Sequence, residues 1–111
     1  MNPSYVFLAA AIVAEVIGTT ALKASEQLTR PVPTIITIAG IGLAFFLLSY
    51  AIRVIPIGIA YAVWSGAGII LITLSAAVVY RQIPDVAAVL GIAMIIGGVL
   101  VIHLYSKSFG H

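Results

Sequence analysis

Four long apolar runs dominate the chain, and short segments between them hold most of the charges. The runs cover residues 4–22, 34–52, 57–80 and 86–105. Each run is close to the ~20 residues that a helix needs to cross a ~30 Å hydrocarbon core. The runs are continuous and do not alternate in polarity, so a transmembrane β-barrel is excluded. The pattern therefore predicts an all-α membrane protein with four transmembrane helices.

The composition supports this fold and leaves almost no chain for a soluble domain. Of the 111 residues, 63% are hydrophobic and 7% are charged, and the mean hydropathy is +1.27. We therefore treat residues 1–111 as a single integral-membrane domain. The five basic residues are scattered and form no nucleic-acid patch, and the absence of cysteine excludes thiol catalysis and disulfides.

The loop charges bear on the orientation of the chain. The connections are short, so consecutive helices should be antiparallel neighbours. Arg53 and Lys107 would then lie on one side of the membrane, and Lys23, Arg30 and Arg81 on the other. Positive charge normally marks the cytoplasmic side, and here it is nearly balanced. Two interpretations follow: a weakly specified single orientation, or dual topology, in which chains insert both ways and pair as an antiparallel homodimer.

Glu15 is a carboxylic acid in the middle of the first run. It lies eleven residues after Ser4, or about 16 Å along a helix, near the bilayer midplane. An acid at that depth costs on the order of 3 kcal/mol and usually faces a cavity that carries ions or substrates. Gly18 and Thr19, one turn further on, leave space beside it. An inert carboxyl that hydrogen-bonds a neighbouring helix is the structural alternative.

Aromatic residues in the third run form a second candidate feature. Tyr61, Trp64, Ser65 and Gly68 share one helical stripe. Trp64 lies too deep in the run for the interfacial aromatic belt. Because aromatic faces attract poorly hydrated organic cations, Trp64 and Tyr61 together with Glu15 predict a site for a lipophilic cation. Helix packing by large rings is the alternative.

Glycines suggest two further roles. Gly66 and Gly68 could allow a bend or a close contact within the third run, as a moving gate needs. Gly91 and Gly98 share a face of the fourth run, and we expect that face to form a dimer contact. His103 has no paired ligand, so we predict no metal site. No nucleophile and base are paired in sequence, so we expect a protein that is not an enzyme and that needs no cofactor.

Two motifs carry a resemblance to a known family. They are Ala-Glu-Val-Ile-Gly-Thr-Thr at residues 14–20 and the run from Pro56 to Gly68. Together with the rest of the chain they closely resemble the small multidrug resistance family of bacterial proton-coupled exporters. The resemblance implies an antiparallel homodimer in the bacterial inner membrane, with protons as the coupling ion. It also implies that Glu15 binds protons and substrate in competition, and that Tyr61 and Trp64 line the pocket.

The same resemblance adds residues to the site. Tyr5 and Phe45 match pocket positions, Ser65 matches a residue beside the glutamate, and Gly91 with Gly98 matches the dimer motif. The stretch at residues 18–20 resembles the branch that exports quaternary ammonium compounds more than the guanidinium branch.

The sequence departs from the family at two places. Gln27 and Leu28 stand where a Gly-Phe pair is usual, and Ile41 stands where well-studied multidrug members carry a pocket tyrosine. We expect the loss of that ring to narrow or shift the range of aromatic cations. Some members act as heteromeric pairs, but the balanced charges favour a chain that pairs with itself.

These features predict a proton-coupled antiporter that exports hydrophobic or quaternary ammonium cations. Its expected partners are an organic cation, membrane lipid and a second copy of the chain, with no nucleic acid. A guanidinium or other small-cation exporter of the same fold is the first alternative. A structural membrane subunit that transports nothing is the second.

Overall fold

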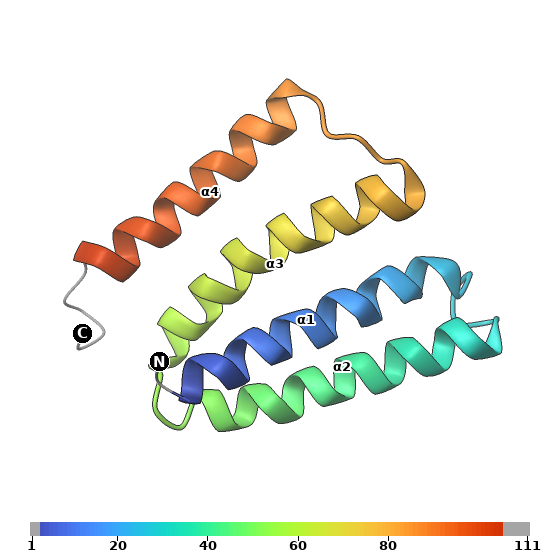
Figure 1. Cartoon of the computed structure of the whole chain (residues 1–111), viewed down its shortest axis with the longest axis horizontal. Coiled ribbons are helices and arrows are strands. Elements are labelled where there is room, and N and C mark those ends of the chain that lie inside the picture. The colour runs from blue at the N-terminus through green and yellow to red at the C-terminus, as the bar shows by residue number, and fades with distance from the viewer. Residues whose placement is uncertain (1–2, 106–111) are drawn as a thin grey trace.

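The computed structural model describes residues 3–105, which fold into four helices and contain no strand (Figure 1). The helices are α1 (Pro3–Ala24), α2 (Pro31–Ala51), α3 (Ile57–Tyr80) and α4 (Val86–Tyr105). All four are long and apolar enough to cross a membrane. The predicted all-α membrane fold is confirmed. Lys107, which entered the charge balance, lies outside the described residues.

The helix bounds match the prediction for α3 and α4 but not at the first loop. There α1 continues to Ala24, two residues beyond the predicted end, and α2 begins at Pro31, three residues before the predicted start. Proline has no N–H to donate and its φ is already helical, so it fits the first turn of a helix. Arg30, just before it, is extended with φ −89° and ψ 125°. The two prolines therefore open α2.

The helices run up and down, as the short connections predicted. In Figure 1, α1 and α2 lie side by side, α3 lies next to α1, and α4 is outermost beyond α3. The amino-terminal end of α1 and the α2–α3 loop lie at one end of the molecule. The α1–α2 and α3–α4 loops lie at the opposite end.

Glycines bring α1 and α2 into very close contact. A Cβ added to Gly40 would lie 2.8 Å from the Ala14 carbonyl oxygen and 3.1 Å from the Gly18 nitrogen. A Cβ added to Gly18 would lie 3.0 Å from Cγ1 of Ile41. Only residues without side chains permit such an approach. The crossing fixes α1 and α2 to each other within one turn of Glu15.

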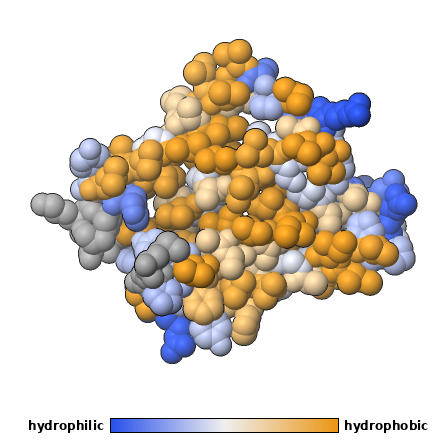
Figure 2. Space-filling model, in the orientation of Figure 1, coloured by the Kyte–Doolittle hydropathy of each residue, from blue (hydrophilic) through white to orange (hydrophobic). Residues whose placement is uncertain are grey.

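An apolar core forms at the end near the α2–α3 loop. Its buried members come from α1, the end of α2, the loop and the start of α3: Leu8, Ile12, Val16, Ala51, Ile55, Ile59 and Ala60. By contrast, α4 has no buried residue and meets α3 where Gly66 would place a Cβ 3.1 Å from Cγ2 of Val99. Much of the surface is apolar, and the hydrophilic residues gather at the ends of the helices, as expected of a protein surrounded by lipid (Figure 2).

The α1–α2 loop has an unusual backbone organised by one buried serine. The Ser25 hydroxyl donates to the Leu22 carbonyl oxygen at 2.6 Å and accepts from the Leu28 N–H at 3.0 Å. Glu26, Gln27 and Leu28 have φ values of 49°, 65° and 67°, in the left-handed region. Glycine adopts this region without steric cost, whereas these three residues carry side chains, so the loop is strained at residues 26–28.

Candidate substrate-binding site

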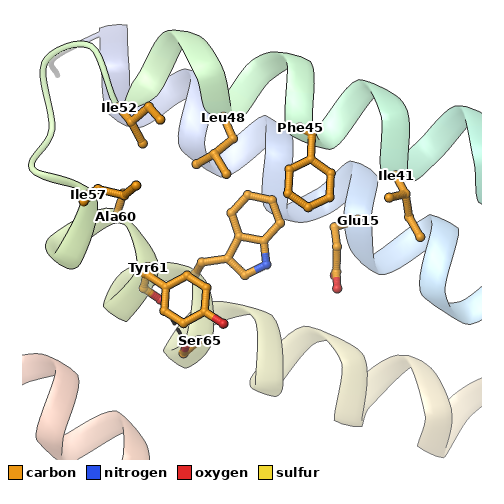
Figure 3. A pocket seen from close by; sticks show the side chains of 10 residues that line it. Glu15, Ile41, Phe45, Leu48, Ile52, Ile57, Ala60, Tyr61 and Ser65 are labelled. Carbon is orange, nitrogen blue, oxygen red and sulfur yellow. Dashed lines mark hydrogen bonds between the residues drawn. The ribbon is translucent and has the colours of Figure 1, made fainter.

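A cavity of about 350 Å³ lies among α1, α2 and α3, and we call it the aromatic cavity. Glu15 reaches into it from α1, Phe45 from α2, and Tyr61 and Ser65 from α3 (Figure 3). Trp64 also lines it. The rest of the lining is aliphatic: Ile41, Leu48, Ile52, Ile57 and Ala60. Three segments far apart in the sequence therefore bring one carboxyl group and three aromatic rings to one apolar cavity.

Glu15 is half-buried and has a hydrogen-bond donor on its own helix. The Thr19 hydroxyl, one turn later, donates to Oε1 of Glu15 at 3.2 Å. The lysines and arginines of residues 3–105 all belong to loops or helix ends, at Lys23, Arg30, Arg53 and Arg81. None of them lies in the middle of a helix, as Glu15 does. A cation bound in the cavity would therefore meet a carboxyl group at a depth where these helices carry no lysine or arginine.

The rings of Phe45, Tyr61 and Trp64, which we call the aromatic wall, come from α2 and α3. The rings of Phe45 and Trp64 are stacked, with centroids 6.4 Å apart and an angle of 27° between their planes. The Ser65 hydroxyl donates to the Tyr61 carbonyl oxygen at 2.9 Å, a bond within α3 that does not engage Glu15. Tyr61 and Phe45 are 73% and 62% exposed, so in a single chain the wall lies open on one side.

A second cavity, of about 300 Å³, adjoins the first, and we call it the hydroxyl cavity. Glu15, Trp64 and Ser65 line both cavities, and Thr19 lines only this one. Its other lining residues come from α3: Gly68, Ile69 and Ile72. Glu15 thus lies between an aromatic compartment and a smaller one that runs between α1 and α3 towards the α1–α2 loop.

Most residues predicted for the site are brought together, and two are not. Glu15, Trp64, Tyr61, Phe45 and Ser65 line the aromatic cavity, and Thr19 lies beside Glu15. These contacts agree with the predicted placement, whereas the binding roles stay predictions.

Tyr5 and Gly18 lie elsewhere in a single chain. Tyr5 lines a third cavity, between α3 and α4, and its ring meets that of His103 edge-on at 6.2 Å. Gly18 is buried in the α1–α2 crossing, where it leaves room for Ile41. Their part in substrate binding stays a prediction.

The predicted hinge and dimer glycines have different surroundings. α3 runs as one helix through Gly66 and Gly68, and Gly66 packs against Val99 of α4. Around Gly91 and Gly98 an added Cβ would meet nothing within 4 Å. That face of α4 is uncovered in one chain, as a dimer contact requires, and both roles stay predictions. Among residues 3–105, no group of three or more His, Cys, Asp or Glu could hold a metal ion.

Sequence reasoning missed the aliphatic lining contributed by the end of α2 and the residue after it, and the glycine where α2 crosses α1. Leu48 and Ile52 line the aromatic cavity, and Gly40 contacts α1. Because α2 is apolar on every side, no periodicity marks its cavity-facing side. Ile41 was noted only as a departure from a family, and the structure places it beside Glu15 on the cavity lining (Figure 3).

Comparison with known proteins gives a consistent result along nearly the whole chain. A family model described as Small Multidrug Resistance protein matches residues 3–95. A multidrug transporter of Pseudomonas aeruginosa is 49% identical over 108 residues, or 97% of this chain and 98% of that protein. The multidrug transporter EmrE of Escherichia coli is 48% identical over 111 residues, covering both chains fully. The quaternary ammonium compound-resistance protein QacF of Klebsiella aerogenes is 47% identical over 108 residues, or 97% and 98% of the two chains.

Proposed function

This chain belongs to the small multidrug resistance family, and we propose that it exchanges protons for hydrophobic or quaternary ammonium cations across the membrane. It is a multi-pass protein of the bacterial inner membrane, in a family of multidrug transporters. The proposal adds a direction, a coupling ion and a binding group. Cations are exported, protons are the coupling ion, and Glu15 binds either of them.

The arrangement of Glu15 against Trp64 and Phe45 carries the proposal. A carboxylate supplies the negative charge that a quaternary ammonium needs, and it accepts a proton when the cation leaves. The stacked rings supply a polarisable surface worth about 0.5–2 kcal/mol for each cation contact. The apolar lining accommodates the hydrocarbon part of the ligand without leaving polar groups unpaired. Relatives named for multidrug transport and quaternary ammonium resistance support the same ligand class.

Competition for Glu15 couples the two flows. A protonated carboxyl has no charge to attract a cation, and a bound cation disfavours protonation. If the site then opens to the two sides of the membrane in turn, protons and cations move in opposite directions. We propose that an antiparallel homodimer provides the two openings. The uncovered α4 face and the open side of the aromatic wall support this pairing.

A Glu15→Gln variant tests the proposal directly. Purified protein in liposomes should take up an aromatic quaternary ammonium, such as benzyltrimethylammonium, when a proton gradient is imposed. The affinity of the protein for this cation should rise with pH by up to about tenfold per pH unit for each proton displaced. Glu15→Gln should abolish both effects, while the matched control Glu26→Gln, in an exposed loop, should keep them. Coupled transport by Glu15→Gln would refute the proposal.

A guanidinium exporter is the competing function within this fold. The aromatic cavity, at about 350 Å³, is much larger than a guanidinium ion and is lined by three rings. We therefore expect bulky aromatic cations to be preferred over guanidinium in the same liposomes. Transport of guanidinium with exclusion of benzyltrimethylammonium would favour the competing function.

A further inference from the structure

Two different contacts hold α1 to α3, one on each side of Glu15. Towards the α2–α3 loop the contact is apolar, with Leu8 and Ile12 of α1 in the same core as Ile59 of α3. Towards the α1–α2 loop it is made of hydrogen bonds between Thr20 of α1 and Ser75 and Tyr80 of α3. The hydroxyl cavity lies between these two contacts, because its lining extends from Glu15 to Ile72, one turn before Ser75.

Each hydrogen bond in this contact has a defined donor and acceptor. Thr20 Oγ1 lies 2.7 Å from the Val16 carbonyl oxygen and 2.7 Å from Ser75 Oγ. A threonine hydroxyl has one hydrogen, which Thr20 donates to Val16, so the Ser75 hydroxyl must donate to Thr20. The Tyr80 hydroxyl donates to the Thr20 carbonyl oxygen at 2.6 Å. The Lys23 ammonium lies 5.5 Å from the centre of the Tyr80 ring, so this contact reaches the edge of the membrane.

This polar contact can separate without leaving a buried group unpaired. When α1 and α3 move apart, Thr20 keeps its bond to Val16, and Ser75 can donate to a carbonyl one turn earlier in its own helix. Water entering from the loop can satisfy the Tyr80 hydroxyl. Opening the apolar contact would instead expose the core side chains Leu8 and Ile59 to water. The end near the α1–α2 loop is therefore the easier one to open.

We infer that the Thr20–Ser75 hydrogen bond, supported by Tyr80, is a gate between Glu15 and the membrane face that carries the α1–α2 loop. The gate closes the hydroxyl cavity and must open once in each transport cycle to let protons or cations reach Glu15. This inference rests on the proposed exchange function. In the proposed antiparallel homodimer, one copy of the gate would lie at each face of the membrane, and alternating access requires that both are never open together.

The chain contains no cysteine, which allows the gate to be locked with an introduced pair. The hydroxyl oxygens of Thr20 and Ser75 are 2.7 Å apart, so sulfur atoms in their place can approach the ~2.05 Å bonding distance. Thr20→Cys/Ser75→Cys should exchange cations when reduced. Oxidation holds both gates of the dimer closed, so it should slow exchange and the binding of benzyltrimethylammonium at least tenfold, and a reducing agent should restore both. The two single-cysteine variants should be insensitive to oxidation.

Three results of this experiment would overturn the gate. They are exchange as fast as in the reduced protein although mass spectrometry verifies the disulfide, failure of a reducing agent to restore exchange, and failure of the pair to oxidise. The last result would contradict the close approach of the two side chains. Separately, a parent protein without Glu15-dependent exchange would refute the proposed function, whereas exchange through a verified disulfide refutes only the gate.

A variant without cysteine tests the gate in the opposite direction. Ser75→Ala removes the donor, so the two gates of a dimer should be open together more often. Liposomes with this variant should lose an imposed pH gradient severalfold faster than those with the parent protein, without any cation. Ser49→Ala is the matched control, because the Ser49 hydroxyl donates only within α2, to the Phe46 carbonyl at 2.6 Å. Equal proton leak rates for Ser75→Ala and Ser49→Ala would contradict the proposal that the Thr20–Ser75 hydrogen bond is a gate.

Discussion

The glycine crossing of α1 and α2 allows a sharp test of how the carboxyl group is positioned. Gly40→Ala places a methyl group against the Ala14 backbone, next to Glu15, whereas Gly42→Ala places one where nothing lies within 4 Å. Both substitutions change the same residue type in the same helix. Comparing them therefore separates the effect of the crossing from the general effect of replacing glycine.

The expected magnitude follows from the distances. The new Cβ at Gly40 would lie 2.8 Å from the Ala14 carbonyl oxygen, about 0.5 Å inside the ~3.3 Å at which carbon and oxygen normally meet. The obstacle is backbone, which cannot rotate away, so α2 must move. Overpacking of this kind costs about 1–3 kcal/mol. Alanine gains up to about 1 kcal/mol of helix propensity at either position, and this gain cancels in the comparison.

We therefore expect Gly40→Ala to be less stable than Gly42→Ala by about 1–3 kcal/mol in its free energy of unfolding. The free energy can be measured by unfolding in mixed micelles, followed by circular dichroism. Because Ile41 moves with Gly40, cation affinity should fall in Gly40→Ala and stay unchanged in Gly42→Ala. Equal stability and equal affinity of the two variants would refute the idea that this crossing positions Glu15 and Ile41.

Three further predictions follow from other contacts. Trp64→Leu should weaken binding of an aromatic cation about 2- to 30-fold in a titration, the equivalent of about 0.5–2 kcal/mol, and an unchanged Kd would contradict the cation contact. Gln27→Gly should raise the free energy of unfolding by about 1 kcal/mol by relieving a left-handed φ, and a loss of stability would contradict that strain. Leucine at both Gly91 and Gly98 should prevent dimerisation in light scattering, with Gly97→Leu, on another side of α4, as the control; intact dimers in the double variant would place the contact elsewhere.

The fold was predictable because a bilayer restricts what the backbone can do. Every N–H and C=O in the hydrocarbon must be paired within its own segment, so the length and polarity of a run are enough to predict a helix. The bounds of α3 and α4 follow directly. The predicted start of α2 is three residues too late because proline, which has no N–H to donate, is suited to the first turn of a helix.

The polar half of the site was predictable, and the apolar half was not. Glu15 and Trp64 stand out because a carboxyl group or an indole deep in a membrane run is costly or rare. Leu48 of α2, and Ile52 directly after α2, carry no such signal among the neighbouring aliphatic residues. Gly40 and the Thr20–Ser75 pair depend on which helices touch, and no pattern within one helix contains that information.

The bare surface of α4 has a consequence for how activity should depend on the amount of protein in a cell. None of its residues is buried in the single chain, so in the proposed dimer a second copy would cover the sides of this helix that α3 leaves open. Two chains must then meet by diffusion in the plane of the membrane. At low chain density the number of dimers rises with the square of the number of chains. Doubling expression should therefore raise export about fourfold while most chains are unpaired, and only twofold once nearly every chain is paired.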